Sequence, residues 1–175
     1  MTLEALMTRK NLMLLAAAGS FGLLAGAFVF QMLGYAPCKM CIWQRWPHGA
    51  AIAIGIVVMF VGPMLLLGVA GALSAAITGG IGVYHTGVER DWWEGPTDCT
   101  GAGDSLAGLS GADLLSTEAA VDIVMCDEVA WAFLGVSMAS WNAIISFALA
   151  AIWIYACLLY TSDAADEHRD VGFSV

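Results

Sequence analysis

Charged side chains are scarce in this sequence. Asp, Glu, Lys and Arg make up 12% of its 175 residues, about half the share of roughly 25% that is usual in soluble domains. They are missing altogether from Asn11 to Cys38, from Trp46 to Val88 and from Val129 to Ser162. Because 60% of the residues are hydrophobic and the mean hydropathy is +0.80, a water-soluble fold of this length could not bury its apolar surface.

Basic residues are scarcer still, with six Lys and Arg against 15 Asp and Glu and a net charge of −9. No basic patch is present, which excludes binding to the phosphates of a nucleic acid. Most of the acidic residues fall between residues 89 and 128, where Arg90 is the only base. The sequence also has no internal repeat, no low-complexity tract and no lipid-anchor motif.

The three uncharged stretches predict membrane spans. A span needs about 20 apolar residues, so the stretches hold one, two and one spans, and Gly62-Pro63 predicts the turn within the middle stretch. We expect an all-α membrane protein, a single four-helix bundle with spans at about 12–33, 42–61, 64–86 and 139–161. A cleavable signal peptide is the alternative for the first stretch, but its apolar run exceeds the roughly 7–15 residues of a signal core.

Arg9 and Lys10 precede the first span and predict that both termini are cytoplasmic. Lys39 and Arg45 lie on the other side and oppose this orientation. The exported loops would then be residues 34–41 and 87–138. In the long loop, apolar residues near one helical face between 113 and 125 predict a short amphipathic helix, lying on the membrane surface or packing on its own loop.

Four of the five cysteines fall in the predicted exported loops, where disulfides can form. Cys38 and Cys41 lie in the short loop, and Cys99 and Cys126 lie in the long one. Cys157 lies in the fourth span, where we expect it to behave as a small hydrophobic residue.

Cys38 and Cys41 form a C-x-x-C motif directly after Pro37, and proline is typical of the first turn of a helix. A helix N-terminus stabilises a thiolate, and the spacing places both sulfur atoms on one face. Arg45 follows one turn deeper on that face. Its guanidinium could hold a thiolate or a quinone oxygen, or it could extend to the lipid headgroups.

His85 and Glu89 are spaced i, i+4 at the exported end of the third span and so share a face. His85 could be a helix-packing group, but ionisable residues within spans are candidates for function. Quinone reduction takes up two protons with two electrons, so we expect both residues to contribute to quinone binding. His48 is a further candidate.

The four cysteines could also serve other purposes. They could form a tetrahedral zinc site, but Cys99 and Cys126 are widely separated and would face an oxidising compartment. A c-type haem would need histidine after Cys41, where Ile42 stands. We therefore expect no metal. Two purely structural disulfides remain an alternative, although they would not explain Arg45.

The order of these motifs along the sequence resembles that of the DsbB family of disulfide-forming membrane oxidases. The strongest match is C-x-x-C-I-aromatic-x-R, from Cys38 to Arg45. His85-Thr86 matches the family's histidine at the end of the third span. Residues 131–135 and Trp141 resemble the stretch that enters its fourth helix. Glu89 departs from the pattern, since a glutamine is expected there.

The resemblance implies a thiol:quinone oxidoreductase of the bacterial inner membrane, with its cysteine pairs facing the periplasm. A reduced DsbA-like thiol protein would attack Cys99, and the released Cys126 would attack Cys38. Cys41 would then remain as a thiolate against ubiquinone or menaquinone, with Arg45 stabilising its charge.

Two other functions stay open. A vitamin K epoxide reductase-like enzyme also couples a C-x-x-C to a quinone, but there the loop pair comes first in sequence, and here Cys38 and Cys41 come first. A non-enzymatic membrane scaffold stapled by disulfides is the other alternative. Structural bridges resist mild reductants, whereas catalytic ones are labile, so reduction would distinguish the scaffold from an enzyme.

Overall fold

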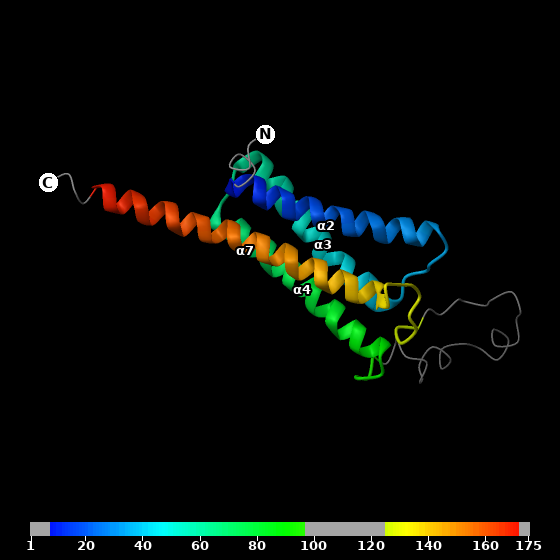
Figure 1. Ribbon diagram of the computed structural model, residues 1–175. Coiled ribbons are helices and arrows are strands. Elements are labelled where there is room, and N and C mark those ends of the chain that lie inside the picture. Colours follow the sequence, from blue (N-terminus) through cyan, green and yellow to red (C-terminus); the bar gives the residue numbers. More distant parts are fainter. Residues whose placement is uncertain (1–7, 97–124, 172–175) are drawn as a thin grey trace, which may run out of the picture.

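The computed structural model describes residues 8–96 and 125–171, with side chains up to Leu159. Its helices are α2 (Arg9–Met32), α3 (Lys39–Val61), α4 (Leu65–Glu89) and α7 (Met138–Val171). α2 and α4 each pack against both α3 and α7, which closes a four-helix bundle (Figure 1). All four are long and apolar enough to cross a membrane, α7 over Met138–Leu159. The predicted four-helix membrane protein is confirmed.

The turn between α3 and α4 lies where Gly62-Pro63 predicted it. Gly62 ends α3 with φ of +94°, a conformation that glycine adopts without steric cost, and Pro63 follows it. The start of α2 lies at this end of the bundle, and α7 extends past it (Figure 1). The start of α3, with Cys38, lies at the opposite end.

α4 packs on α7 through small residues that share one helical face. These buried residues are Gly68, Gly71, Ala75, Thr78, Gly79 and Gly82. The fully buried ring of Trp153 on α7 lies against Gly71, where an added Cβ would come within 2.5 Å of ring atoms. Small residues let membrane helices approach closely, and here they make room for a tryptophan.

The outer surface of the bundle is rich in large apolar side chains. Phe21, Phe60 and Ile77 are 61%, 82% and 54% exposed, and they lie on three different helices. Such a surface would cause aggregation in water. In a membrane it contacts the lipid tails.

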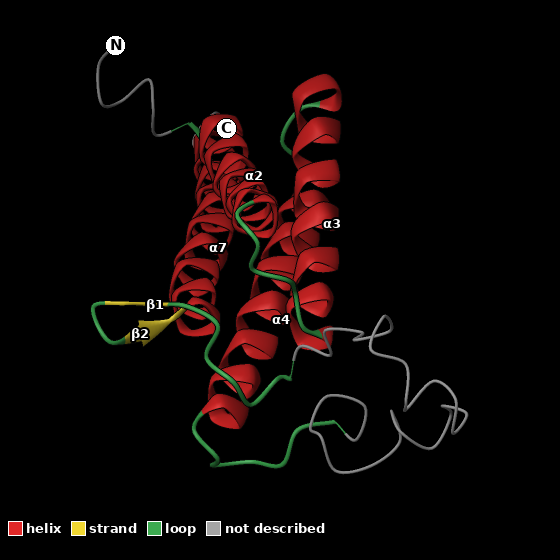
Figure 2. Ribbon diagram, turned by 90° about the vertical axis from the view of Figure 1, so that its right-hand side faces the viewer, coloured by secondary structure: helices red, strands yellow, loops and turns green. Residues whose placement is uncertain are grey.

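A two-stranded hairpin precedes α7, and the sequence had not predicted it. β1 (Ala132–Phe133) pairs antiparallel with β2 (Val136–Ser137), beside the start of α7 (Figure 2). Leu134 and Gly135 both have positive φ, 53° and 75°, which is the type I′ geometry that matches the twist of two strands. Nearly all of the amphipathic helix predicted for residues 113–125 lies outside the described residues.

Candidate active site

Cys38 and Cys41 form a close thiol pair at the start of α3. Cys38 is the N-cap residue, and its Sγ accepts a hydrogen bond from the backbone N–H of Cys41 at 3.2 Å. Both cysteines are free, and the Cys38 thiol donates a hydrogen bond to Cys41 Sγ at 2.9 Å. This donated bond, together with burial, raises the pKa of Cys38. Because Cys38 keeps its proton, Cys41 is the sulfur placed to carry negative charge.

Cys126 joins this pair in space. It is disulfide-bonded and fully buried. It belongs to one cluster with Cys38, Met40 and Val88, and Cys41 packs against that cluster. The structure therefore brings Cys126 to the C-x-x-C motif from a distant part of the chain. Cys99, its predicted partner, lies outside the described residues.

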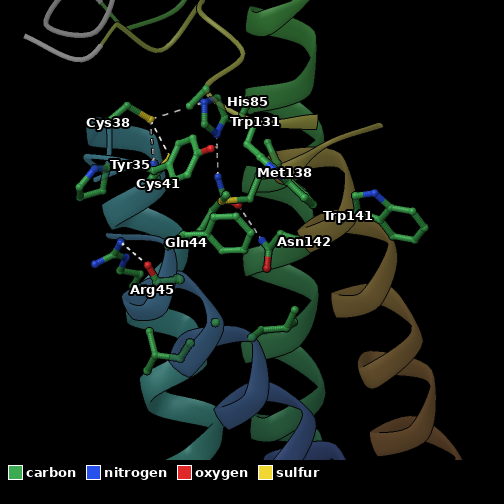
Figure 3. A pocket seen from close by; sticks show the side chains of 18 of the residues that line it. Tyr35, Cys38, Cys41, Gln44, Arg45, His85, Trp131, Met138, Trp141 and Asn142 are labelled. Carbon is green, nitrogen blue, oxygen red and sulfur yellow. Dashed lines mark hydrogen bonds between the residues drawn. The ribbon is translucent and has the colours of Figure 1, made fainter. Parts of the chain in front are cut away.

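His85 of α4 is buried between the thiols and an amide. Its Nε2 lies 3.5 Å from Cys38 Sγ, and its Nδ1 lies 2.9 Å from Gln44 Nε2 (Figure 3). Because the Gln44 amide nitrogen can only donate, Nδ1 accepts, and the proton of the neutral imidazole is on Nε2, facing the sulfur. The ligand atoms of Cys38, Cys41 and His85 all lie within 4.8 Å of one another. A metal would need Nε2 without its proton, so this arrangement favours a hydrogen-bond donor over a ligand.

A cavity of about 260 Å³ opens beside the thiol pair. Most of its wall is apolar and comes from α2, from the start of α7 and from Met125 to Trp131. The polar side chains of its wall include those of Cys38, Cys41, Gln44, Arg45, His48, His85, Glu89, Glu128 and Asn142, with the hydroxyl of Tyr35. A largely apolar pocket with a few polar groups is typical of a site for a small hydrophobic ligand.

Arg45 crosses from α3 to α2. Its Nη1 donates to Gln31 Oε1 at 2.7 Å, and its guanidinium lies 4.8 Å from the centre of the Phe28 ring. The Nε atom of Arg45 is buried and has no hydrogen-bond partner among the described residues. A buried donor without a partner is costly, so an acceptor oxygen within the cavity would satisfy it. A quinone, which is a flat ring with carbonyl oxygens, fits this combination of apolar wall, orphan donor and nearby thiol.

Glu89, at the end of α4, also lines the cavity. Its Oε2 accepts a hydrogen bond from the Ser137 hydroxyl. Ser137 Oγ is 3.0 Å from Ser140 Oγ, which is 2.9 Å from Thr86 Oγ1. The carboxyl group therefore ends a short chain of hydroxyls, a position from which it could exchange a proton with an occupant of the cavity.

The structure thus places Cys38, Cys41, Arg45, His85 and Glu89 around one cavity, with Cys126 against Cys38. Two further residues, Gln44 and Asn142, had not been predicted. Both carry amides within apolar membrane-spanning helices, and polar side chains in spans are candidates for function, so their rarity there was the available signal. Cys157 lies away from the site, against Gly68 in the α4–α7 interface.

Comparison with known proteins decides the family. The sequence model of the family described as Disulfide bond formation protein DsbB matches residues 9–156. The chain belongs to the DsbB family. A protein named Disulfide bond formation protein B from Albidiferax ferrireducens is 26% identical over 158 residues, covering 82% of this chain and 87% of that protein.

A second relative of the same name, from Xanthomonas oryzae, is 28% identical over 138 residues, with 75% of this chain and 80% of that protein covered. A third, from a Polaromonas species, is 25% identical over 154 residues, with 83% and 88% covered. No solved structure matches the chain. As a DsbB family member, the protein is a multi-pass membrane oxidoreductase of disulfide bond formation.

Proposed function

We propose that this protein reoxidises a DsbA-like thiol protein in the periplasm and transfers the electrons to a quinone of the bacterial inner membrane. One observation supports this most strongly. The disulfide-bonded Cys126 packs against Cys38, whose partner Cys41 lines an apolar cavity together with Arg45. A carrier of electrons between a soluble thiol and a lipid-soluble acceptor needs this juxtaposition of two cysteine pairs and a membrane-embedded pocket.

The transfer is a series of thiol–disulfide exchanges. A thiolate of the partner attacks Cys99, breaks the Cys99–Cys126 disulfide and releases Cys126 as a thiolate. Cys126 attacks Cys38 and breaks the Cys38–Cys41 disulfide, so that the leaving electron pair resides on Cys41. The second thiol of the partner displaces Cys99, which then attacks Cys126 and frees Cys38.

The partner leaves this sequence as a disulfide, and the two electrons reside in the Cys38–Cys41 dithiol. This end state corresponds to the arrangement in the structure, where Cys38 and Cys41 are free and Cys126 is disulfide-bonded. When bound, a quinone supplies the oxidising power, since it accepts two electrons and two protons as Cys38 and Cys41 form their disulfide again. Arg45 Nε would bind an oxygen of the occupant, and Glu89 would hold a proton at the cavity wall.

The test is quinone reduction by purified protein with a reduced DsbA-like partner and ubiquinone or menaquinone, followed by quinone absorbance. The wild-type protein should turn over, and Cys41→Ser should not, because it cannot form the Cys38–Cys41 disulfide. Cys157→Ser is the matched control, since Cys157 lies outside the cavity, and it should behave as wild type. Absence of turnover by folded wild-type protein with both quinones would favour a scaffold stapled by disulfides.

A further inference from the structure

A second set of polar side chains lies deeper in the bundle than the thiols, between α3, α4 and α7. Its members are Gln44, His48, Thr78, Asn142 and Ser146. Asn142 is at the centre, because it contacts the other four. Buried polar groups in a membrane protein generally find partners within the protein, and of these five side chains only His48, at Nδ1, has a buried polar atom without one among the described residues. The donor and acceptor roles in this cluster therefore determine how its amide groups are oriented.

The amide of Asn142 fits in one orientation. Its Nδ2 donates to Gln44 Oε1 at 2.6 Å and to Thr78 Oγ1 at 3.4 Å. Thr78 can accept this bond because its own hydroxyl hydrogen goes to the backbone carbonyl of Gln44, at 3.0 Å. Asn142 Oδ1 accepts from Ser146 Oγ at 3.4 Å and faces His48 Nε2 at 2.9 Å. A reversed amide would place Oδ1 against Gln44 Oε1, with no hydrogen between the two oxygen atoms.

The amide of Gln44 is fixed from both sides as a result. Its Oε1 receives the hydrogen bond from Asn142, and its Nε2 donates to the Met40 carbonyl at 3.3 Å and to His85 Nδ1 at 2.9 Å. The Met40 carbonyl, which can only accept, favours the same orientation of Gln44, but the much shorter bond from Asn142 is the stronger constraint. His85 must then carry its proton on Nε2, which faces Cys38 Sγ at 3.5 Å, and the ring also hydrogen-bonds to the backbone of Cys126.

We propose that Asn142 is a positioning residue for the thiol pair, which acts through Gln44 to hold His85 as a hydrogen-bond donor to Cys38. The hydrogen bonds run in one direction, from His48 through Asn142, Gln44 and His85 to Cys38 and then to Cys41. Aligned hydrogen bonds strengthen one another. A thiol pair that shares one negative charge accepts a hydrogen bond better than a disulfide does. Asn142 therefore stabilises the reduced Cys38–Cys41 pair relative to its disulfide, and this part of the proposal rests on the proposed function.

The test compares full-length wild-type protein with Asn142→Leu in detergent micelles, using two measurements. The first is the nitrogen-15 chemical shift of the His85 ring, which reports whether Nδ1 or Nε2 carries the proton. The second is the equilibrium constant for reduction of the Cys38–Cys41 pair by dithiothreitol, read by alkylation and mass spectrometry of the peptide that contains both cysteines. Ser146→Ala is the matched control, because it removes a buried hydroxyl that contacts Asn142 but does not donate to Gln44.

In Asn142→Leu we expect His85 to lose its single Nε2–H tautomer and the reduction constant to fall about tenfold, which is about 30 mV for a two-electron couple. Ser146→Ala should change neither quantity. In a His85→Phe background, Asn142→Leu should cause no further fall, because the route through His85 is gone. If Asn142→Leu does not fold, Asn142→Ala, which has a smaller side chain, should give the same two results.

An unchanged His85 tautomer in a folded Asn142 variant would overturn the proposal. So would a fall in the reduction constant that persists in the His85→Phe background, because Asn142 would then act by another route. The tautomer measurement needs neither a partner protein nor a quinone. A tautomer change in a protein that does not reduce quinone would therefore refute the proposed function while supporting the positioning role.

Discussion

The two thiols of the C-x-x-C motif differ in their surroundings. Cys38 is 4% exposed and donates a hydrogen bond to Cys41, which raises the pKa of Cys38, whereas Cys41 is partly exposed and faces the cavity. In reduced protein we expect iodoacetamide at pH 7 to alkylate Cys41 first. The thiolate fraction falls about tenfold for each unit by which a thiol's pKa is raised. Peptide mass spectrometry after short pulses measures both rates.

The alkylation rates of Cys38 and Cys41 should both rise with pH, but over different ranges. Only the thiolate reacts, so the alkylation rate of a thiol rises with pH until its pKa is passed. Because the pKa of Cys38 is raised, its rate should keep rising in the alkaline range where an ordinary thiol has levelled off. Unfolded protein supplies the ordinary reference. Equal rates at Cys38 and Cys41, or a rate at Cys38 that levels off as in unfolded protein, would contradict the described hydrogen bond.

Replacement of Arg45 tests its contribution to quinone binding. Arg45→Met keeps the length of the side chain near Phe28 but removes the buried Nε donor. Loss of a charged hydrogen bond of about 1.5–3 kcal/mol should raise the KM for quinone about tenfold or more. A single turnover of partner oxidation should remain normal. Gln31→Met is the control, because it removes only the outer contact of Arg45. An unchanged KM in Arg45→Met would remove Arg45 from the binding site.

The site residues that could be predicted from the sequence are those related by local spacing. Cys38, Cys41 and Arg45 follow one another at three and four residues, so a helical periodicity alone places them on one face. His85 and Glu89 are related in the same way on α4. Gln44 and Asn142 meet across 98 positions of sequence, and no periodicity predicts such a contact. Their roles depend on how α3 and α7 pack, which the sequence alone does not specify.

The interface between helices α4 and α7 depends on glycine. A Cβ at position 71 would lie 2.5–2.7 Å from three ring atoms of Trp153, while a Cβ at position 80, on the same helix, would meet nothing within 4 Å. We therefore expect Gly71→Ala to destabilise the protein by about 1–3 kcal/mol through overpacking. Gly80→Ala should be neutral or slightly stabilising, since alanine is the better helix former.

Thermal unfolding of both variants in the same detergent provides the measurement, with helix content followed by circular dichroism. A lower melting temperature for Gly71→Ala alone would locate the effect at Trp153. Equal melting temperatures for Gly71→Ala and Gly80→Ala would mean that Trp153 moves aside, and that close approach of α4 and α7 is not needed for stability.

Elements of different length were not equally predictable. The helices follow from long uncharged runs, and Gly62-Pro63 marks a turn whatever surrounds it. The hairpin of β1 and β2 has two residues in each strand, too few for an alternating pattern. Leu134, at φ of 53°, is also not a residue that favours a type I′ turn. Gly135 was the only local signal, and it is equally typical of an open loop.

The four-helix bundle has two ends with different chemistry. Cys38, Cys126 and the hairpin lie at one end, and Arg9 and Lys10 lie at the other, where Lys10 Nζ donates to the backbone carbonyl of Met59 at 3.1 Å (Figure 1). The number of spans follows from the sequence, because apolar length is a local property. The direction of insertion rests on a small difference in basic charge between the ends.

The proposed function depends on this orientation, because the cysteine pairs must face the periplasm. Green fluorescent protein fused after Val175 should fluoresce in intact bacteria, and alkaline phosphatase fused there should be inactive, because basic residues retain the α2 start in the cytoplasm. Replacing Arg9 and Lys10 by glutamine should raise phosphatase activity, whereas Lys39→Gln, which removes an opposing charge, should not. An active phosphatase fusion on the unaltered chain would place Cys38 and Cys126 in the reducing cytoplasm, where a protein that generates disulfides could not keep its own pairs oxidised.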